Sequence, residues 1–112
     1  MIVSRGDKIY PRDIDEVLFS HPKILEACCI GISDPDAGQA VKAFIVLKKG
    51  EHATPEEIMD SCRKSLPENH IPRSVDFMEG LPRNPIGKVL RKELRRVHLV
   101  QSSLANLKGS TQ

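Results

Sequence analysis

Two segments rich in apolar and β-branched residues, 24–32 and 41–47, constrain the fold of this chain most strongly. Between them lies a dense cluster of turn-forming residues over positions 33–38, which includes a proline, a glycine and two aspartates. Because so short a connection joins strands that run in opposite directions, the pattern predicts an antiparallel strand pair. A chain of 112 residues has room for about one small domain built around such a pair.

One helix is predicted before this pair in the sequence, and a second helix is predicted after it. The first begins with proline and covers residues 11–20, and it ends at His21-Pro22 because the residue before a proline is pushed out of the helical conformation. The second begins at Thr54, which with Glu57 three residues later has the pattern of a capping box, and it ends at Pro67. The apolar stripe of the second helix consists of Ile58, Met59, Cys62 and Leu66.

The last third of the chain predicts a short third strand over residues 74–78 and then a third helix. Lys88 lies where the preceding loop becomes this helix, and residues 99–112 are expected to form a frayed or disordered tail. The expected architecture is an α+β fold, in which helices flank a small antiparallel three-stranded sheet and an N-terminal β-hairpin or arm comes first. The apolar side of the third helix consists of Val89, Leu90, Leu94 and Val97.

Composition excludes several classes of protein. No apolar run approaches the roughly 18 residues of a membrane helix, and the first residues lack the pattern of a secretory signal, so we expect a cytoplasmic chain without a membrane span. Cys28, Cys29 and Cys62 are three in number, with no CxxC and no clustered histidine. We therefore expect no disulfide framework and no metal site, and interpret all three cysteines as small buried hydrophobic residues.

Basic residues gather near the end of the chain, where residues 83–96 contain six lysines or arginines and a single acid, Glu93. An anionic partner could dock there, but the favoured interpretation is a solvated helix face. Nucleic acid is a weaker candidate, because this stretch has no aromatic side chain on which bases could stack. The residues assigned to the solvated face are Arg91, Lys92, Arg95 and Arg96.

Lys88 differs from the other cations because it follows Gly87 at the end of a loop with two prolines. A lysine in this setting can be held on an arm and directed into the cleft of a partner. Its ammonium group suits a reaction that brings two anions together, such as the attack of a carboxylate on a phosphate. The segment is not a phosphate-cradling P-loop, because the preceding glycines are too few and Val89 replaces the hydroxyl residue. Spacing alone leaves the role of an ordinary surface lysine open.

Residues 81–94, LPRNPIGKVLRKEL, closely resemble the last signature of the adenylate-forming superfamily, which includes acyl-CoA synthetases, aryl-CoA ligases, luciferases and peptide-synthetase adenylation domains. Residues 1–15 resemble the segment that follows the interdomain hinge in that family. The resemblance extends over about residues 1–98. It is also carried by His21-Pro22, Asp34-Pro35, Gly38 and Ile71-Pro72-Arg73.

The resemblance implies that residues 1–98 are the C-terminal lid domain of an AMP-forming acid–thiol ligase. Such enzymes join a carboxylic acid to ATP, release pyrophosphate, and then transfer the acyl group to a thiol, often that of coenzyme A. In the family, the lysine that matches Lys88 is catalytic and contacts the substrate carboxylate and phosphate oxygens in the first step. Pro82, Gly87 and Arg91 match supporting positions of the same motif.

The resemblance also implies a second functional face. The glycine that matches Gly6 lines the pantetheine tunnel during the thiol step, with Arg5 and Lys8 beside it. Arg5 departs from the family, which has glycine or serine there, and puts the thiol partner in doubt. His70 stands where many relatives have lysine, and we interpret it as a surface residue rather than a catalytic base.

The partner implied by the resemblance is an N-terminal nucleotide-binding domain, which would lie upstream of Met1 together with the acyl pocket. ATP with magnesium and coenzyme A would then bind only in the full-length enzyme, and this chain alone is expected to be inactive and to bind none of them. Overall likeness favours a fatty or aryl acid as substrate. The alternatives are a non-catalytic module that binds a carrier protein or a partner ligase, and a nucleic-acid-binding domain.

Overall fold

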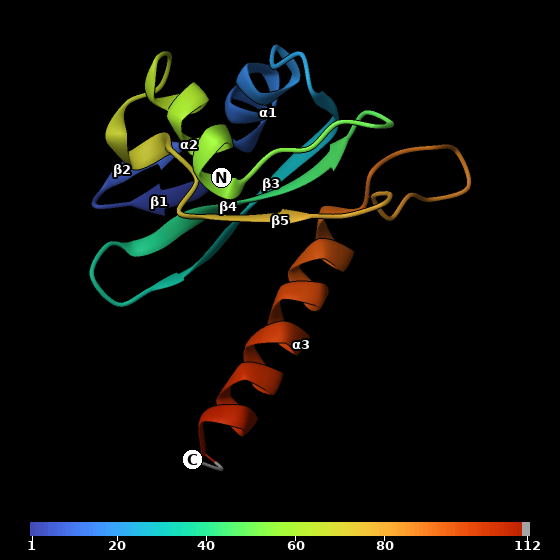
Figure 1. The fold of residues 1–112 in the computed structure, drawn as a ribbon. Coiled ribbons are helices and arrows are strands. Elements are labelled where there is room, and N and C mark those ends of the chain that lie inside the picture. The colour runs from blue at the N-terminus through green and yellow to red at the C-terminus, as the bar shows by residue number, and fades with distance from the viewer. Residues whose placement is uncertain (111–112) are drawn as a thin grey trace.

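The computed structural model describes the backbone of residues 1–110 and the side chains of residues 1–101. Its centre is a five-stranded sheet with helices on both faces (Figure 1). The predicted α+β class is confirmed, but the predicted three-stranded sheet is too small. The strands are β1 (Ile2–Ser4), β2 (Asp7–Ile9), β3 (Ile24–Asp34), β4 (Gly38–Leu47) and β5 (Ser74–Phe77).

The predicted antiparallel pair is the long hairpin of β3 and β4. Its register runs from Ile24 opposite Leu47 to Asp34 opposite Gly38, so both strands extend into the segment predicted as a turn. The extension is possible because Gly38 adopts a left-handed φ of 87°. The tip is closed further by the Asp34 side chain, whose Oδ1 accepts a hydrogen bond from the Asp36 N–H at 3.2 Å.

The predicted N-terminal hairpin is formed by β1 and β2, and it belongs to the main sheet. Ser4 of β1 pairs with Gly38 of β4, and the Arg5 N–H donates to the Ala37 carbonyl at 2.8 Å. The sequence did not predict this junction, because it depends on a contact between segments more than thirty residues apart.

The third predicted strand, β5, runs parallel to β4, so the prediction of a purely antiparallel sheet is wrong. The physical reason is the connection between the two strands. After β4 the chain crosses one face of the sheet through α2 (Pro55–Arg63) and a short 3₁₀ turn (Glu68–His70) before it returns as β5. A crossover of this kind delivers the next strand in the same direction as the first.

Helices α1 (Pro11–Phe19) and α2 cover one face of the sheet, whereas α3 (Arg91–Ser110) leaves from the other face (Figure 1). Thr54 caps α2 as predicted, since its Oγ1 accepts the Glu57 N–H at 3.2 Å. The Glu57 carboxylate lies 3.2 Å from Lys23 Nζ rather than completing a capping box within the described residues.

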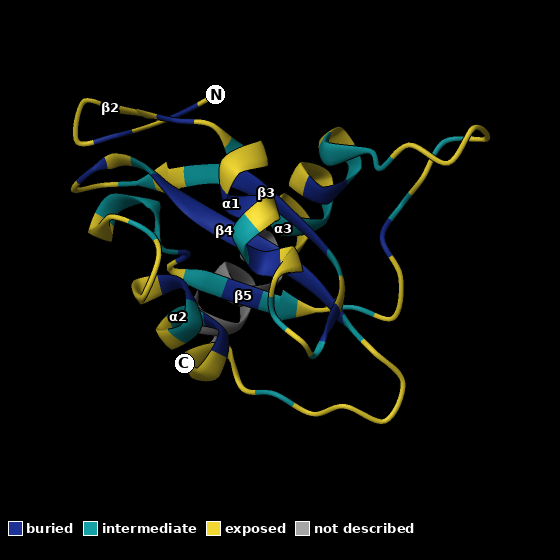
Figure 2. Cartoon of the chain, turned by 90° about the horizontal axis from the view of Figure 1, so that it is seen from above, coloured by how far each residue is buried: buried dark blue, intermediate teal, exposed yellow. Residues whose placement is uncertain are grey.

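Each face of the sheet has its own apolar cluster, because successive strand residues point to opposite sides. Figure 2 shows that the long strand β4 is buried along most of its length. Cys29 packs in the cluster under α1 and α2, while the adjacent Cys28 packs in the cluster near α3. Both are buried free thiols, as is Cys62 in α2, which confirms their interpretation as buried hydrophobic residues.

The third helix differs from its prediction at both ends. It begins at Arg91, so Val89 and Leu90 precede it, and its backbone continues to Ser110. A domain boundary at residue 98 and fraying of the chain over 99–112 stay predictions, and residues 111 and 112 lie outside the described part.

Candidate functional site

Lys88 lies on a tight hairpin rather than at the junction of loop and helix. Arg83 pairs with Val89 in an isolated antiparallel bridge, and inside this bridge the Asn84 N–H donates to the Lys88 carbonyl at 2.9 Å. The Gly87 N–H donates to the Asn84 carbonyl at 2.9 Å, and Gly87 has a φ of 89°. This is a type I turn followed by a residue in the left-handed conformation, which explains why glycine precedes the lysine.

The hairpin is attached to the body of the domain at its base. The Arg83 guanidinium donates to the Gly87 carbonyl at 2.7 Å and forms an ion pair with Glu26 of β3. On the other side, the Leu90 N–H donates to the Pro82 carbonyl at 2.9 Å. Pro82 and Gly87, which match supporting positions of the family motif, thus both accept hydrogen bonds that hold the hairpin together.

The Lys88 side chain is exposed. Its ammonium group has no hydrogen bond or ion pair among the side chains that the structure describes, whereas its backbone is bonded on both sides to Asn84. An ordered backbone that carries an unpaired cation can present that cation to an anion on another molecule or domain.

Arg91 corrects the prediction of a solvated helix face. Its guanidinium donates to Asp15 Oδ2 and to the Cys29 carbonyl, each at 2.6 Å. Burial alone would lower the pKa of Arg91, but the hydrogen bond and the charge of Asp15 outweigh it and raise the pKa. Arg91 is therefore a structural anchor of α3. The other members of the predicted face, Lys92, Arg95 and Arg96, are exposed as expected.

The second predicted group lies on the turn between β1 and β2. Arg5 and Gly6 have φ values of 50° and 84°, so both central residues of this two-residue turn are left-handed, as a type I′ hairpin requires. A Cβ atom at Gly6 would meet no atom within 4 Å. The backbone conformation, and not lack of space inside the domain, therefore favours glycine here. Lys8 is exposed on β2.

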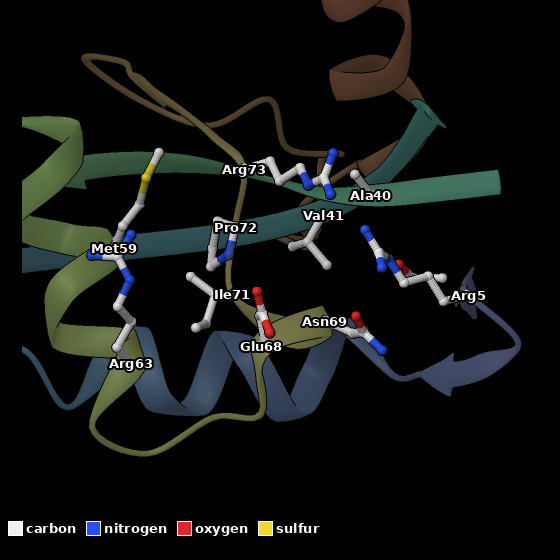
Figure 3. Close-up of a pocket in the computed structure, with 11 residues that line it drawn as sticks. Arg5, Ala40, Val41, Met59, Arg63, Glu68, Asn69, Ile71, Pro72 and Arg73 are labelled. Carbon is white, nitrogen blue, oxygen red and sulfur yellow. The ribbon is translucent and has the colours of Figure 1, made fainter. Parts of the chain in front are cut away.

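Beside this turn is a pocket of about 340 Å³. The pocket opens where β1 and β5 pair with the same edge of β4 at different positions along that strand. Arg5 projects into it from the turn (Figure 3). Its lining contains three arginines and one carboxylate, that of Glu68. Arg73 is paired with Asp34 at 2.8 Å, and Arg63 is paired with Asp60. The lining residues are Ser4, Arg5, Ala40, Val41, Met59, Arg63, Glu68, Asn69, Ile71, Pro72 and Arg73.

The structure does not bring the two predicted groups together. The turn that carries Arg5 and Gly6 lies at one end of the sheet, and the hairpin that carries Lys88 lies at the other end (Figure 1). The domain therefore presents the two groups on two different surfaces.

His70 is the remaining residue considered from the sequence. His70 lies at the end of the 3₁₀ turn, half-buried, and its ring makes no polar contact among the described residues. No group of three potential metal ligands occurs in that region either. Across residues 1–110, none of the helices combines the length and apolar character needed to cross a membrane.

Sequence reasoning missed Asp15 and Asn84. Asp15 occupies a buried position on α1 next to Ile14 and Leu18, so a carboxylate beside an apolar stripe was the available signal. Asn84 begins Asn84-Pro85-Ile86-Gly87, and asparagine, proline and glycine at these positions are typical of a turn with a left-handed last residue.

Comparison with known proteins agrees with the arrangement described above. The family model for the AMP-binding enzyme C-terminal domain matches residues 13–88. A long-chain-fatty-acid–CoA ligase of Yersinia pestis is 42% identical over 95 residues, which make up 85% of this chain and 17% of the relative. A 2-succinylbenzoate–CoA ligase of Bacillus cereus (strain Q1) is 45% identical over 97 residues, 87% of this chain and 20% of the relative.

Solved structures give the same result. An acyl-CoA synthetase of Brucella canis superposes with a TM-score of 0.84 at 36% identity, over 90% of this chain and 19% of that protein. The amide bond synthetase McbA of Marinactinospora thermotolerans superposes with a TM-score of 0.81 at 34% identity, over 85% of this chain and 19% of that protein. The chain thus spans about a fifth of the length of the relatives it matches. Because the family model covers more than half of the chain, the chain belongs to the family of AMP-binding enzyme C-terminal domains.

Proposed function

We propose that this chain is the C-terminal domain of an ATP-dependent, AMP-forming acid–thiol ligase and that Lys88 is its adenylation lysine. The observation that carries the proposal is the exposed, unpaired Lys88 side chain on an ordered hairpin, within the described residues. In the first reaction a carboxylate oxygen forms a bond to the α-phosphorus of ATP, and the bond from that phosphorus to the leaving pyrophosphate breaks. Both reactants are anions, so a cation between them lowers the barrier.

The donor set of the chain fits this role. The described residues offer a cation and no cluster of metal ligands, so a magnesium ion would be held by the triphosphate and by the proposed nucleotide-binding partner domain. Lys88 would contribute direct contact with the reacting oxygens. When bound, ATP with magnesium supplies the activated phosphate.

The opposite end of the sheet is proposed to serve the thiol step. A side chain at Gly6 would meet nothing inside the domain, so the bare backbone there leaves room for a molecule that approaches from outside. The adjoining pocket is lined by Arg5, Arg63 and Arg73. Guanidinium groups suit phosphates, which favours a phosphate-bearing thiol such as coenzyme A as the acceptor.

Adenylation can be tested by combining this chain with the nucleotide-binding domain from the same source. Pyrophosphate release would be followed with ATP, magnesium and a panel of fatty and aryl acids. We expect Lys88→Ala to lower the rate by about 100-fold or more. Lys92→Ala is the matched control, because Lys92 is also exposed and lies four residues further on, and it should behave as wild type. Equal rates for the two variants would refute the assignment of Lys88.

The acceptor requires a second assay, since one structural relative is named an amide bond synthetase. Preformed acyl-adenylate would be offered either coenzyme A or a primary amine. Gly6→Asn adds a side chain while asparagine tolerates the left-handed conformation, so we expect it to slow transfer to coenzyme A and leave pyrophosphate release unchanged. Transfer to the amine alone would overturn the thiol assignment.

The non-catalytic alternative predicts a different pattern. A binding module would keep its activity when Lys88 is replaced and would lose partner binding when the charges of Arg95 and Arg96 are reversed. Arg91 is unsuitable for that test, because its reversal would also break the contact with Asp15.

A further inference from the structure

The hairpin that carries Lys88 contains a side chain, Asn84, whose hydrogen bonds to described residues all lie within the hairpin itself. Asn84 Oδ1 accepts hydrogen bonds from two backbone N–H groups, that of Ile86 at 3.1 Å and that of Lys88 at 2.9 Å. The first bond closes the turn, and the second fixes the peptide from which the lysine side chain departs. The Asn84 backbone is bonded to Lys88 and Gly87 as well.

These contacts bear on the lysine because its side chain is a long, flexible stem. The reach of the ammonium group depends on where the stem begins and in which direction it leaves the backbone. The Arg83 side chain already fixes the hairpin on the sheet, because it donates to the Gly87 carbonyl and forms an ion pair with Glu26 of β3. What remains is the orientation of the Lys88 peptide within the hairpin, and among the described residues the Lys88 N–H is bound by the Asn84 side chain alone.

We propose that Asn84 is a positioning residue for Lys88, whose side-chain oxygen orients the Lys88 peptide so that the ammonium group reaches the reacting oxygens. This inference rests on the proposed function of Lys88 in adenylation. It predicts that loss of the Asn84 oxygen affects the adenylation step and leaves the thiol step intact, because the thiol face lies at the other end of the sheet (Figure 1).

The proposal makes a specific distinction between two substitutions. Asn84→Ala removes the acceptor of both hydrogen bonds. Asn84→Asp keeps a carboxylate oxygen that can accept the same two N–H groups. A role in folding alone would predict that Asn84→Ala lowers pyrophosphate release and acyl transfer alike. A positioning role predicts that only pyrophosphate release falls and that the aspartate variant regains it.

The experiment uses the two-component assay and the chain itself. Pyrophosphate release should fall about 10-fold or more in kcat for Asn84→Ala, with little change in the KM for ATP. Asn84→Asp should stay within about threefold of wild type, and acyl transfer from preformed adenylate should be equal in all three proteins. In the chain alone, NMR measurement of amide hydrogen exchange should show faster exchange at Ile86 and Lys88 in Asn84→Ala and restored protection in Asn84→Asp.

Two results would overturn the positioning role. The first is an Asn84→Ala variant as active as wild type while Lys88→Ala is inactive. The second is unchanged exchange at Ile86 and Lys88 in Asn84→Ala. If Lys88→Ala itself retains full activity, the proposed function fails and the positioning role falls with it, and this outcome is separate from the other two.

Discussion

The guanidinium of Arg91 lies 2.6 Å from the carboxylate of Asp15, although the two residues are 76 positions apart in the sequence. Between them they also bind both backbone polar groups of Cys29. Arg91 donates to the Cys29 carbonyl at 2.6 Å, and Asp15 Oδ1 accepts the Cys29 N–H at 2.9 Å. Because β3 is an edge strand, this ion pair takes the place of a neighbouring strand and joins α1, β3 and α3.

We expect Asp15→Asn to destabilise the domain by about 2 kcal/mol, because it leaves the half-buried Arg91 charge without its partner. Urea denaturation would measure the change in unfolding free energy. Asp60→Asn is the matched control: it removes the exposed ion pair with Arg63 and should change stability by less than about 0.5 kcal/mol. Similar losses of unfolding free energy in the two variants would show that the Asp15–Arg91 pair contributes no more to stability than the exposed pair.

The turn at Arg5 and Gly6 should respond to backbone preference rather than to packing. Gly6→Val places a β-branched residue at a φ of 84° and is expected to destabilise by about 2 kcal/mol. Gly80→Val is the control, since a Cβ there also meets nothing within 4 Å and no left-handed φ is required. Thermal denaturation of both variants gives the comparison. If both lower the melting temperature equally, strain at Gly6 is not the cause.

Cys28 should make the stability of the domain sensitive to alkaline pH. Burial raises the pKa of its thiol from 9.0 to about 11, partly opposed by the charge of Arg91. The folded state then holds this proton more tightly than the unfolded state. The stabilisation is full below pH 9 and is lost as the pH rises toward 11, so the unfolding free energy falls over that window.

The measurement is urea denaturation at several pH values between 8 and 11, with Cys28→Ala for comparison. The variant should lose stability less steeply as the pH rises, whatever its stability at pH 8. If the plots of unfolding free energy against pH run parallel for the two proteins, the assignment of the raised pKa to Cys28 is wrong.

Local patterns were reliable where neighbouring residues decide the conformation. The cap at Thr54 and the β3–β4 pair are confirmed, because a hydroxyl three residues before an amide and a run of β-branched residues act over short distances. The predicted direction of β5 is wrong, because the direction depends on how the whole connection through α2 returns the chain to the sheet. The start of the third helix was also misplaced, because the turn chemistry of Asn84 was not recognised.

The sequence by itself determined which helices and strands form, the turn glycines, the family and Lys88 as a candidate. Each of these depends on patterns of residues that lie close together in the chain. Only the tertiary structure decided that Arg91 is an anchor and not a solvated cation, and that the hairpin of β1 and β2 joins the main sheet. It also placed the β1–β2 turn and the hairpin that follows β5 at opposite ends of that sheet (Figure 1). These relationships depend on contacts between distant segments, and the charge or size of a residue does not specify which distant group it will meet until the sheet has formed.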